Sequence, residues 1–170
     1  AARYLCGAPD RQRQKRRTGV SGPTPPLFVF GAGAWGTALA IMFAKRGTQT
    51  ALITRSEEKA QQLQIERVNE EKLPSLRFPQ SLQAYSFGQD STWQDSLAQD
   101  PNGVVLLASP AQSTREMVEA LAPILAPSHA LILTAKGLER GTQLRLTDVV
   151  KQVHPNLDPM VLSGPSFAHD

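Results

Sequence analysis

Three glycines separate a short apolar run from a longer one between residues 27 and 44 of the chain. LFVF, residues 27–30, is followed by GAGAWG and then by TALAIMFA. Gly31, Gly33 and Gly36 thus have the spacing G-x-G-x-x-G between a predicted strand and a predicted helix. This arrangement restricts the region to a strand–turn–helix unit, in which the turn is either a phosphate cradle or an ordinary structural turn.

The chemistry of such a turn depends on where each glycine stands. In a dinucleotide-binding fold the first glycine makes the tight turn, the second lets the backbone approach the pyrophosphate, and the third lets helix and strand pack closely. The start of the helix then offers free N–H groups to the phosphates. We therefore predict that Gly31, Gly33 and Gly36 bind a dinucleotide. Trp35 is expected either to flank this cofactor or to pack on the start of the helix.

Short apolar runs alternate with amphipathic stretches along the rest of the chain. Strands are predicted at residues 27–30, 50–54, 104–108, 130–134 and 159–162, and helices at residues 34–46, 56–69, 109–125 and 145–154. Ser56 and Ser109 are the predicted N-caps of the second and third helices, and the stretch with Pro74 and Pro79 is predicted to be irregular. This succession predicts an α/β fold with a Rossmann-like, doubly wound, mostly parallel sheet in a single domain.

Basic residues are concentrated in the first 25 residues of the chain. Six of the eighteen lie there beside a single acid, Asp10, so the remainder is mildly acidic although the net charge is +3. Nucleic-acid-binding domains carry a basic structured face, so we expect no nucleic-acid partner. Residues 1–25 are expected to be a disordered basic leader and linker, which also fits an organelle transit peptide, and residues 26–170 to be one NAD(P)-binding domain.

Membrane, disulfide and metal chemistry find little support in the sequence. The longest apolar runs are shorter than the roughly 18 residues of a membrane-spanning helix, and the single cysteine, Cys6, excludes an intrachain disulfide. We expect a cytoplasmic protein, or one of the plastid stroma if the leader is a transit peptide. His129, His154 and His169 lack metal-ligand spacing, so no metal is predicted, and His129 and His154 are expected to be solvated.

The residue about 20 positions after the glycines indicates which of NAD and NADP is preferred. In NAD-binding folds this residue is a carboxylate that binds the ribose. Thr54 and Arg55 occupy this place. A guanidinium matches a 2′-phosphate in charge and geometry, so the sequence favours NADP over NAD. Glu57 or Glu58 would reach the ribose if the strand ended later than residue 54.

Two later segments follow predicted strands and offer groups that bind anions. TAKGLE places Lys136 just after the strand at residues 130–134, where open α/β sheets collect their ligands. The alternative for Lys136 is a solvated loop lysine. LSGPSFA, residues 162–168, would begin a helix at Pro165, with the Ser166 hydroxyl and several N–H groups free to meet a phosphate.

Four motifs carry a resemblance to a known family: FGAGAWGTALA, N…LP (Asn69, Leu73 and Pro74), TAKGLE and LSGPSFA. In this order they resemble the NAD(P)-dependent glycerol-3-phosphate dehydrogenases of bacteria and plastids, over residues 27–170. The resemblance implies reversible reduction of dihydroxyacetone phosphate to sn-glycerol 3-phosphate, which supplies phospholipid synthesis.

The same resemblance implies the residues of the site. Cofactor contacts fall on Ala34, Trp35, Arg55, Lys136 and Ala168, and substrate contacts on Lys136, Gly164 and Ser166. In the family a helical C-terminal domain follows and carries the general-base lysine. The chain stops before such a domain, so no catalytic residue is predicted within it, and homodimerisation of the full-length enzyme is left open.

Two other interpretations stay open on the sequence. One is a non-catalytic dinucleotide-binding module. The other is a different β-hydroxyacid-type dehydrogenase that acts on a carboxylate substrate.

Overall fold

The structure, a computed structural model, describes residues 24–88 and 92–163. Its main sheet contains six parallel strands in the order β5-β2-β1-β6-β7-β8. These strands are β1 (Leu27–Phe30), β2 (Thr50–Thr54), β5 (Leu82–Ser86), β6 (Val104–Leu107), β7 (Ala130–Leu133) and β8 (Pro159–Val161). Counted along the chain, the spatial order is 3-2-1-4-5-6, which is that of doubly wound dinucleotide-binding sheets. The predicted fold class is confirmed.

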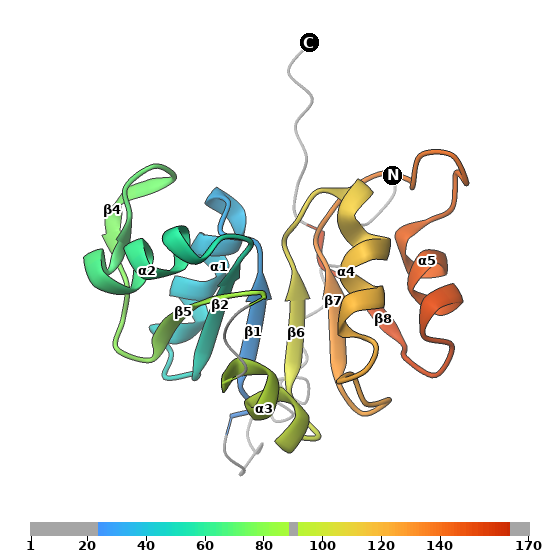
Figure 1. Cartoon of the computed structure of the whole chain (residues 1–170), viewed down its shortest axis with the longest axis horizontal. Coiled ribbons are helices and arrows are strands. Elements are labelled where there is room, and N and C mark those ends of the chain that lie inside the picture. The colour runs from blue at the N-terminus through green and yellow to red at the C-terminus, as the bar shows by residue number, and fades with distance from the viewer. Residues whose placement is uncertain (1–23, 89–91, 164–170) are drawn as a thin grey trace, which may run out of the picture.

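Helices cover both faces of this sheet (Figure 1). They are α1 (Ala34–Ala44), α2 (Glu57–Glu66), α3 (Thr92–Gln99), α4 (Thr114–Leu121) and α5 (Leu146–Val153). In β1, Leu27 and Val29 pack with residues of α1 and α2, whereas Phe28 and Phe30 pack with residues of α3, α4 and α5. Because the central strands are buried on both faces, they appear in the sequence as unbroken apolar runs.

The region between α2 and β6 is more regular than predicted. It contains the antiparallel pair β3 (Val68–Asn69) and β4 (Leu73–Arg77), the edge strand β5, and α3. The prediction of irregular structure is therefore wrong at Pro74, which lies within β4, whereas Pro79 lies between β4 and β5, outside any strand or helix. Strand β5 escaped detection because buried Leu82 and Ala84 alternate with half-buried Gln83 and Tyr85, and no apolar run results.

The start of α4 also differs from the prediction. Pro110 is extended, with ψ 147°, and is followed by a short 3-10 turn, η2 (Ala111–Ser113), so that α4 begins only at Thr114. Ser109 is therefore no N-cap. By contrast, α2 begins as predicted, with Ser56 Oγ accepting a hydrogen bond from the Lys59 N–H at 3.2 Å.

His129 is buried rather than solvated, with only 4% of its surface exposed. Its Nδ1 accepts a hydrogen bond from the Ala126 N–H at 3.0 Å, so Nε2 carries the proton and donates to the Asp100 carbonyl at 2.9 Å. His154 is half-buried, with Nε2 3.1 Å from the Leu125 carbonyl. Both imidazoles link loops on the side of the sheet opposite to the glycine-rich turn.

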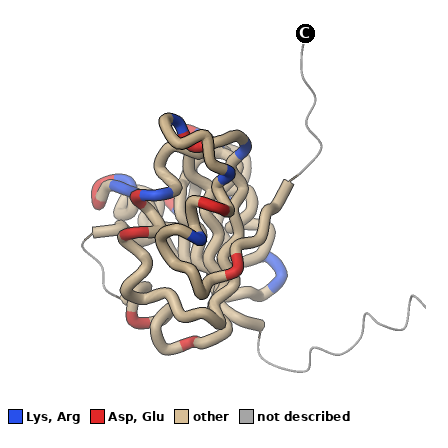
Figure 2. Tube along the Cα trace, turned by 90° about the vertical axis from the view of Figure 1, so that its right-hand side faces the viewer, with Lys and Arg blue, Asp and Glu red and all other residues tan. Residues whose placement is uncertain are grey.

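Basic and acidic positions are interspersed along the chain (Figure 2), and the described residues carry as many of one sign as of the other. None of the helices in these ranges is long and apolar enough to span a bilayer. The same ranges contain no group of three His, Cys, Asp or Glu side chains that could hold a metal ion.

Candidate functional site

The glycine-rich turn joins the carboxyl end of β1 to α1, and two of its glycines are required by packing. Gly31 has φ +115°, and a Cβ there would lie 2.6 Å from the Ala108 carbonyl oxygen. A Cβ on Gly36 would lie 2.0 Å from the Gly31 carbonyl oxygen. Any side chain at either position would therefore push the turn away from β6 or from α1.

Gly33 is different, because a Cβ on it would meet no atom within 4 Å. It is exposed, and it is the N-cap of α1. The packing of the described residues does not demand a glycine here, whereas the close approach of a ligand to the backbone would. The turn therefore fits a bound dinucleotide.

The first turn of α1 is open to an anion. No side chain among the described residues caps it, and it contains no acidic residue. The first intrahelical bond runs from the Thr37 N–H to the Gly33 carbonyl at 2.9 Å. The N–H groups that precede Thr37 thus point out of the helix, at the positive end of its dipole.

A cavity of about 370 Å³ lies beside this turn, at the carboxyl ends of β1, β2 and β6. We call it the glycine groove. It is lined by Phe30, Gly31, Ala32, Gly33, Ile53, Thr54, Arg55, Ser56, Lys59, Phe87, Ala108, Ser109, Pro110 and Met117. It lies where the strand order reverses between β1 and β6, the place where doubly wound sheets bind ligands. The Ser109 Oγ is buried there without a hydrogen-bond partner in the described structure, which leaves it available to a ligand.

Asn69 donates hydrogen bonds to the glycine-rich turn and to α1, a role that the sequence did not reveal. It is fully buried, and its Nδ2 donates to the Ala32 carbonyl at 3.0 Å and to Thr37 Oγ1 at 2.9 Å. One side chain from β3 thus holds both the turn and the first turns of α1. The signal available in the sequence was its place in the N…LP motif, which gave the residue no function.

Arg55 directly follows β2 and lines the glycine groove. In the described ranges no acidic side chain pairs with it. Strand β2 ends at Thr54 as predicted, so the condition under which Glu57 would reach a ribose is not met. Lys59, which the sequence did not single out, lines the same groove.

Trp35 and Ala34 begin α1 and are exposed. Trp35 keeps 52% of its surface accessible, so its ring does not pack into the core. An indole in this position is available to a ligand on the turn.

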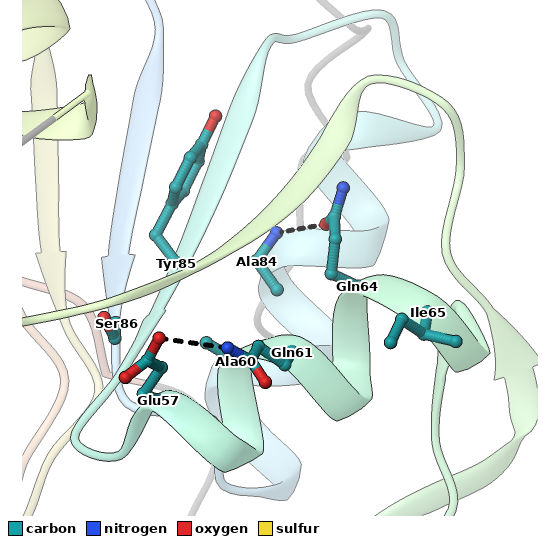
Figure 3. Close-up of a pocket in the computed structure, with 8 residues that line it drawn as sticks. All are labelled: Glu57, Ala60, Gln61, Gln64, Ile65, Ala84, Tyr85 and Ser86. Carbon is teal, nitrogen blue, oxygen red and sulfur yellow. Dashed lines mark hydrogen bonds between the residues drawn. The ribbon is translucent and has the colours of Figure 1, made fainter. Parts of the chain in front are cut away.

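Glu57 lines a different cavity, of about 390 Å³, between α2 and β5 (Figure 3). Its carboxylate accepts a hydrogen bond from Gln61 Nε2 at 3.0 Å. In the same cavity, Gln64 Oε1 accepts from the Ala84 N–H of the edge strand at 2.9 Å. This cavity is therefore built around the outer edge of β5 and not around the glycine-rich turn.

Lys136 lies three residues beyond β7 and is exposed. It lines a third cavity, of about 330 Å³, together with Arg145, Thr147 and Ser163. Lys136 and the glycine-rich turn share the carboxyl edge of the sheet but line separate cavities. The other predicted positions in this region, Gly164, Ser166 and Ala168, lie outside the described residues.

The loop that carries Lys136 is fixed to η2 and α4 by side chains. Arg115 donates from Nε and from its terminal nitrogen to the two carboxylate oxygens of Glu139, each at 2.8 Å. Gln112 Nε2 donates to the Leu138 carbonyl at 3.0 Å, and its Oε1 accepts from the Arg140 N–H at 2.8 Å. The Arg115 guanidinium, with the Thr142 hydroxyl, lowers the pKa of Glu139 to about 2.

Comparison with known proteins places this chain in a family. Residues 26–170 match the family model described as NAD-dependent glycerol-3-phosphate dehydrogenase N-terminus. The glycerol-3-phosphate dehydrogenase [NAD(P)+] of Afipia carboxidovorans is 39% identical over 144 residues, covering 85% of this chain and 42% of the relative. That of Parvibaculum lavamentivorans is 38% identical over 142 residues, covering 84% and 40%.

A solved structure shows the same relationship in three dimensions. The crystal structure of glycerol-3-phosphate dehydrogenase from Coxiella burnetii aligns with a TM-score of 0.72 at 29% identity, covering 86% of this chain and 42% of that one. The chain thus spans about two fifths of the length of the relatives it matches. With its strand order, its glycine-rich turn and these matches, the chain belongs to the glycerol-3-phosphate dehydrogenase family, of which it carries the N-terminal, NAD(P)-binding part.

Proposed function

We propose that residues 26–170 are the dinucleotide-binding domain of an enzyme that reversibly reduces dihydroxyacetone phosphate to sn-glycerol 3-phosphate, the backbone precursor of phospholipids. One observation carries the proposal: the turn from Gly31 to Gly36 leads into an uncapped helix while Gly33 stays open to a ligand. The names of the relatives supply the substrate.

The residues of this chain would bind and orient the reactants. The N–H groups at the start of α1 would hold the pyrophosphate, with Trp35 beside it. When bound, the nicotinamide supplies the hydride. Lys136, at the carboxyl edge of the sheet, would hold the anionic substrate or polarise its carbonyl, joined by Gly164 and Ser166, with Ala168 as a further cofactor contact.

Reduction of a carbonyl also needs a proton donor within reach of the developing alkoxide. In the family this donor is a lysine in the part of the sequence that follows the matched region. We therefore expect residues 26–170 on their own to bind the dinucleotide without turning over dihydroxyacetone phosphate. Substrate-dependent oxidation of NADPH by the isolated chain would contradict this assignment of roles.

The cofactor preference proposed is NADP over NAD. Arg55 lines the glycine groove, and no Asp or Glu among the described residues lines it. A guanidinium there would attract a 2′-phosphate, and a ribose with free hydroxyls would lack its usual carboxylate partner.

Fluorescence titration of the chain with NADPH and with NADH tests the binding function. Gly33→Val should abolish binding, because the new side chain would occupy the place of the ligand. It should not unfold the chain, because a Cβ at this position meets no protein atom within 4 Å. Ala98→Val, at an exposed site on α3, is the matched control and should bind normally. Unchanged binding by Gly33→Val would overturn the proposal.

A further inference from the structure

Lys59 stands on the first turn of α2 and lines the glycine groove together with Arg55. Both side chains lie at the carboxyl end of β2, where doubly wound folds place the adenosine ribose. We propose that Lys59 is a second cation for a 2′-phosphate, so that Lys59 and Arg55 together select the phosphorylated dinucleotide. This inference rests on the proposed binding function and adds a specificity-determining residue to it.

The position of Lys59 is fixed by the local fold. Its N–H donates to the Ser56 Oγ, and Thr54 Oγ1 donates to the Ser56 carbonyl at 2.7 Å, which closes the turn from β2 into α2. The turn sets Arg55 and Lys59 on either side of Ser56, and all three line the groove. A phosphate at this turn would therefore meet a guanidinium, a hydroxyl and an ammonium from one short segment.

The ammonium of Lys59 is held only loosely by its present partners. Its Nζ lies 3.3 Å from Glu71 Oε2 and 3.3 Å from Gln62 Oε1. Glu71 is shared, because its Oε1 lies 2.6 Å from Lys72 Nζ, and Lys72 and Lys59, in that order, lower the pKa of Glu71. Exposed ion pairs of this kind are weak, so a phosphate dianion in the groove would compete well for Lys59.

The acidic neighbour that would favour NAD is directed elsewhere. Figure 3 shows the Glu57 carboxylate beside Gln61, in the cavity between α2 and β5. The groove side of the same helical turn carries Lys59 instead. Lys59 thus lines the groove at the ribose position, whereas Glu57 lines the cavity beside β5.

Two substitutions with opposite expected effects test the inference. Lys59→Gln should weaken NADPH binding about tenfold, the size expected for one lost hydrogen bond to a charged group, and should leave NADH binding within about twofold. Glu71→Gln removes the competitor for the Lys59 ammonium, so it should tighten NADPH binding and leave NADH unchanged. Lys45→Gln, at the end of α1 remote from the glycine groove, is the matched control and should bind both dinucleotides normally.

The measurement is the dissociation constant of the chain for NADPH and for NADH, by fluorescence or calorimetry, at ionic strengths of roughly 20 and 200 mM. Thermal unfolding of each variant verifies that it is folded. NADPH affinity should fall more steeply with salt than NADH affinity, and less steeply in Lys59→Gln than in the unsubstituted chain.

The outcomes separate this inference from the function on which it rests. If the unsubstituted chain binds neither dinucleotide, both are overturned. If it binds NADPH and NADH but Lys59→Gln weakens both equally or neither, the binding function stands and the role of Lys59 is overturned. A selective loss of NADPH with Lys59→Gln and a selective gain with Glu71→Gln support the inference.

Discussion

At the scale of single residues, the two crowded glycines of the turn make different demands from the open one. A Cβ on Gly36 would overlap the Gly31 carbonyl oxygen, whereas a Cβ on Gly33 would meet nothing within 4 Å. Gly36→Ala should therefore lower the free energy of unfolding by about 1–3 kcal/mol or more, the usual cost of overpacking. Gly33→Ala, the matched control, should stay within about 0.5 kcal/mol. Urea unfolding measures both, and equal stability of the two variants would contradict the packing argument.

Asn69 allows a second test at this scale. Asn69→Ala removes the donor to the Ala32 carbonyl and to Thr37 Oγ1 in a buried place. Leaving these acceptors unsatisfied should cost about 1–3 kcal/mol of unfolding free energy, and it should weaken dinucleotide binding because the turn loses its support. Asn102→Ala, on an exposed turn, should change neither quantity. Normal NADPH affinity in Asn69→Ala would show that the turn keeps its shape unaided.

At the scale of elements, the pair of Arg115 and Glu139 holds the loop between β7 and α5 to α4. The pKa of Glu139 is lowered to about 2, so its charged form stabilises the fold above the ordinary carboxyl pKa, and this contribution disappears as pH falls toward 2. Glu139→Gln should lower stability at pH 7, and its difference from the unsubstituted chain should shrink between about pH 5 and about pH 2.

Urea unfolding across this pH range measures the effect. Glu70→Gln, an exposed carboxylate on the hairpin of β3 and β4, is the control for loss of one negative charge. If the two variants follow the same pH dependence, the interaction of Glu139 with Arg115 does not stabilise the fold.

The elements that sequence reasoning found are those whose own residues decide their structure. Strands β1, β2, β6 and β7 are apolar on both faces, and the glycine-rich turn is defined within six residues. Strand β5 was missed because its own residues form no apolar run, and its strand structure depends on pairing with β2. The start of α4 was predicted too early. Ser109 and Pro110 have the residue types of a helix start, but in the structure they line the glycine groove and Pro110 is extended.

The candidate site shows the same division. Gly31, Gly33, Gly36 and Arg55 could be named from their spacing alone. Asn69 contacts Ala32 and Thr37, which precede it in the sequence by 37 and 32 positions. Arg115 and Glu139 are 24 positions apart. Such contacts depend on the folded arrangement of several elements, which no short pattern contains.

At the scale of the whole molecule, the central pair β1 and β6 joins two halves that share one sheet. If the sheet unfolds as a single unit, NADPH at 100 times its dissociation constant should raise the free energy of unfolding by about 2.7 kcal/mol throughout. Hydrogen exchange at Leu131 and Leu133 of β7, remote from the glycine-rich turn, should then slow as much as exchange in β1. Protection confined to β1, β2 and α1 would show that the halves open independently.

The two borders of the sheet differ in how they meet their surroundings. Along β5, Gln64 accepts from the Ala84 N–H, and Arg67, at φ +54°, donates to the Pro79 and Leu82 carbonyls at 2.7 and 2.6 Å. Along β8, exposed Met160, Val161 and Leu162 carry no charge. Charged and hydrogen-bonded borders resist the docking of a foreign strand, and plain apolar borders invite it. Among the described residues, the border that offers a plain apolar edge to a further strand is therefore β8 and not β5.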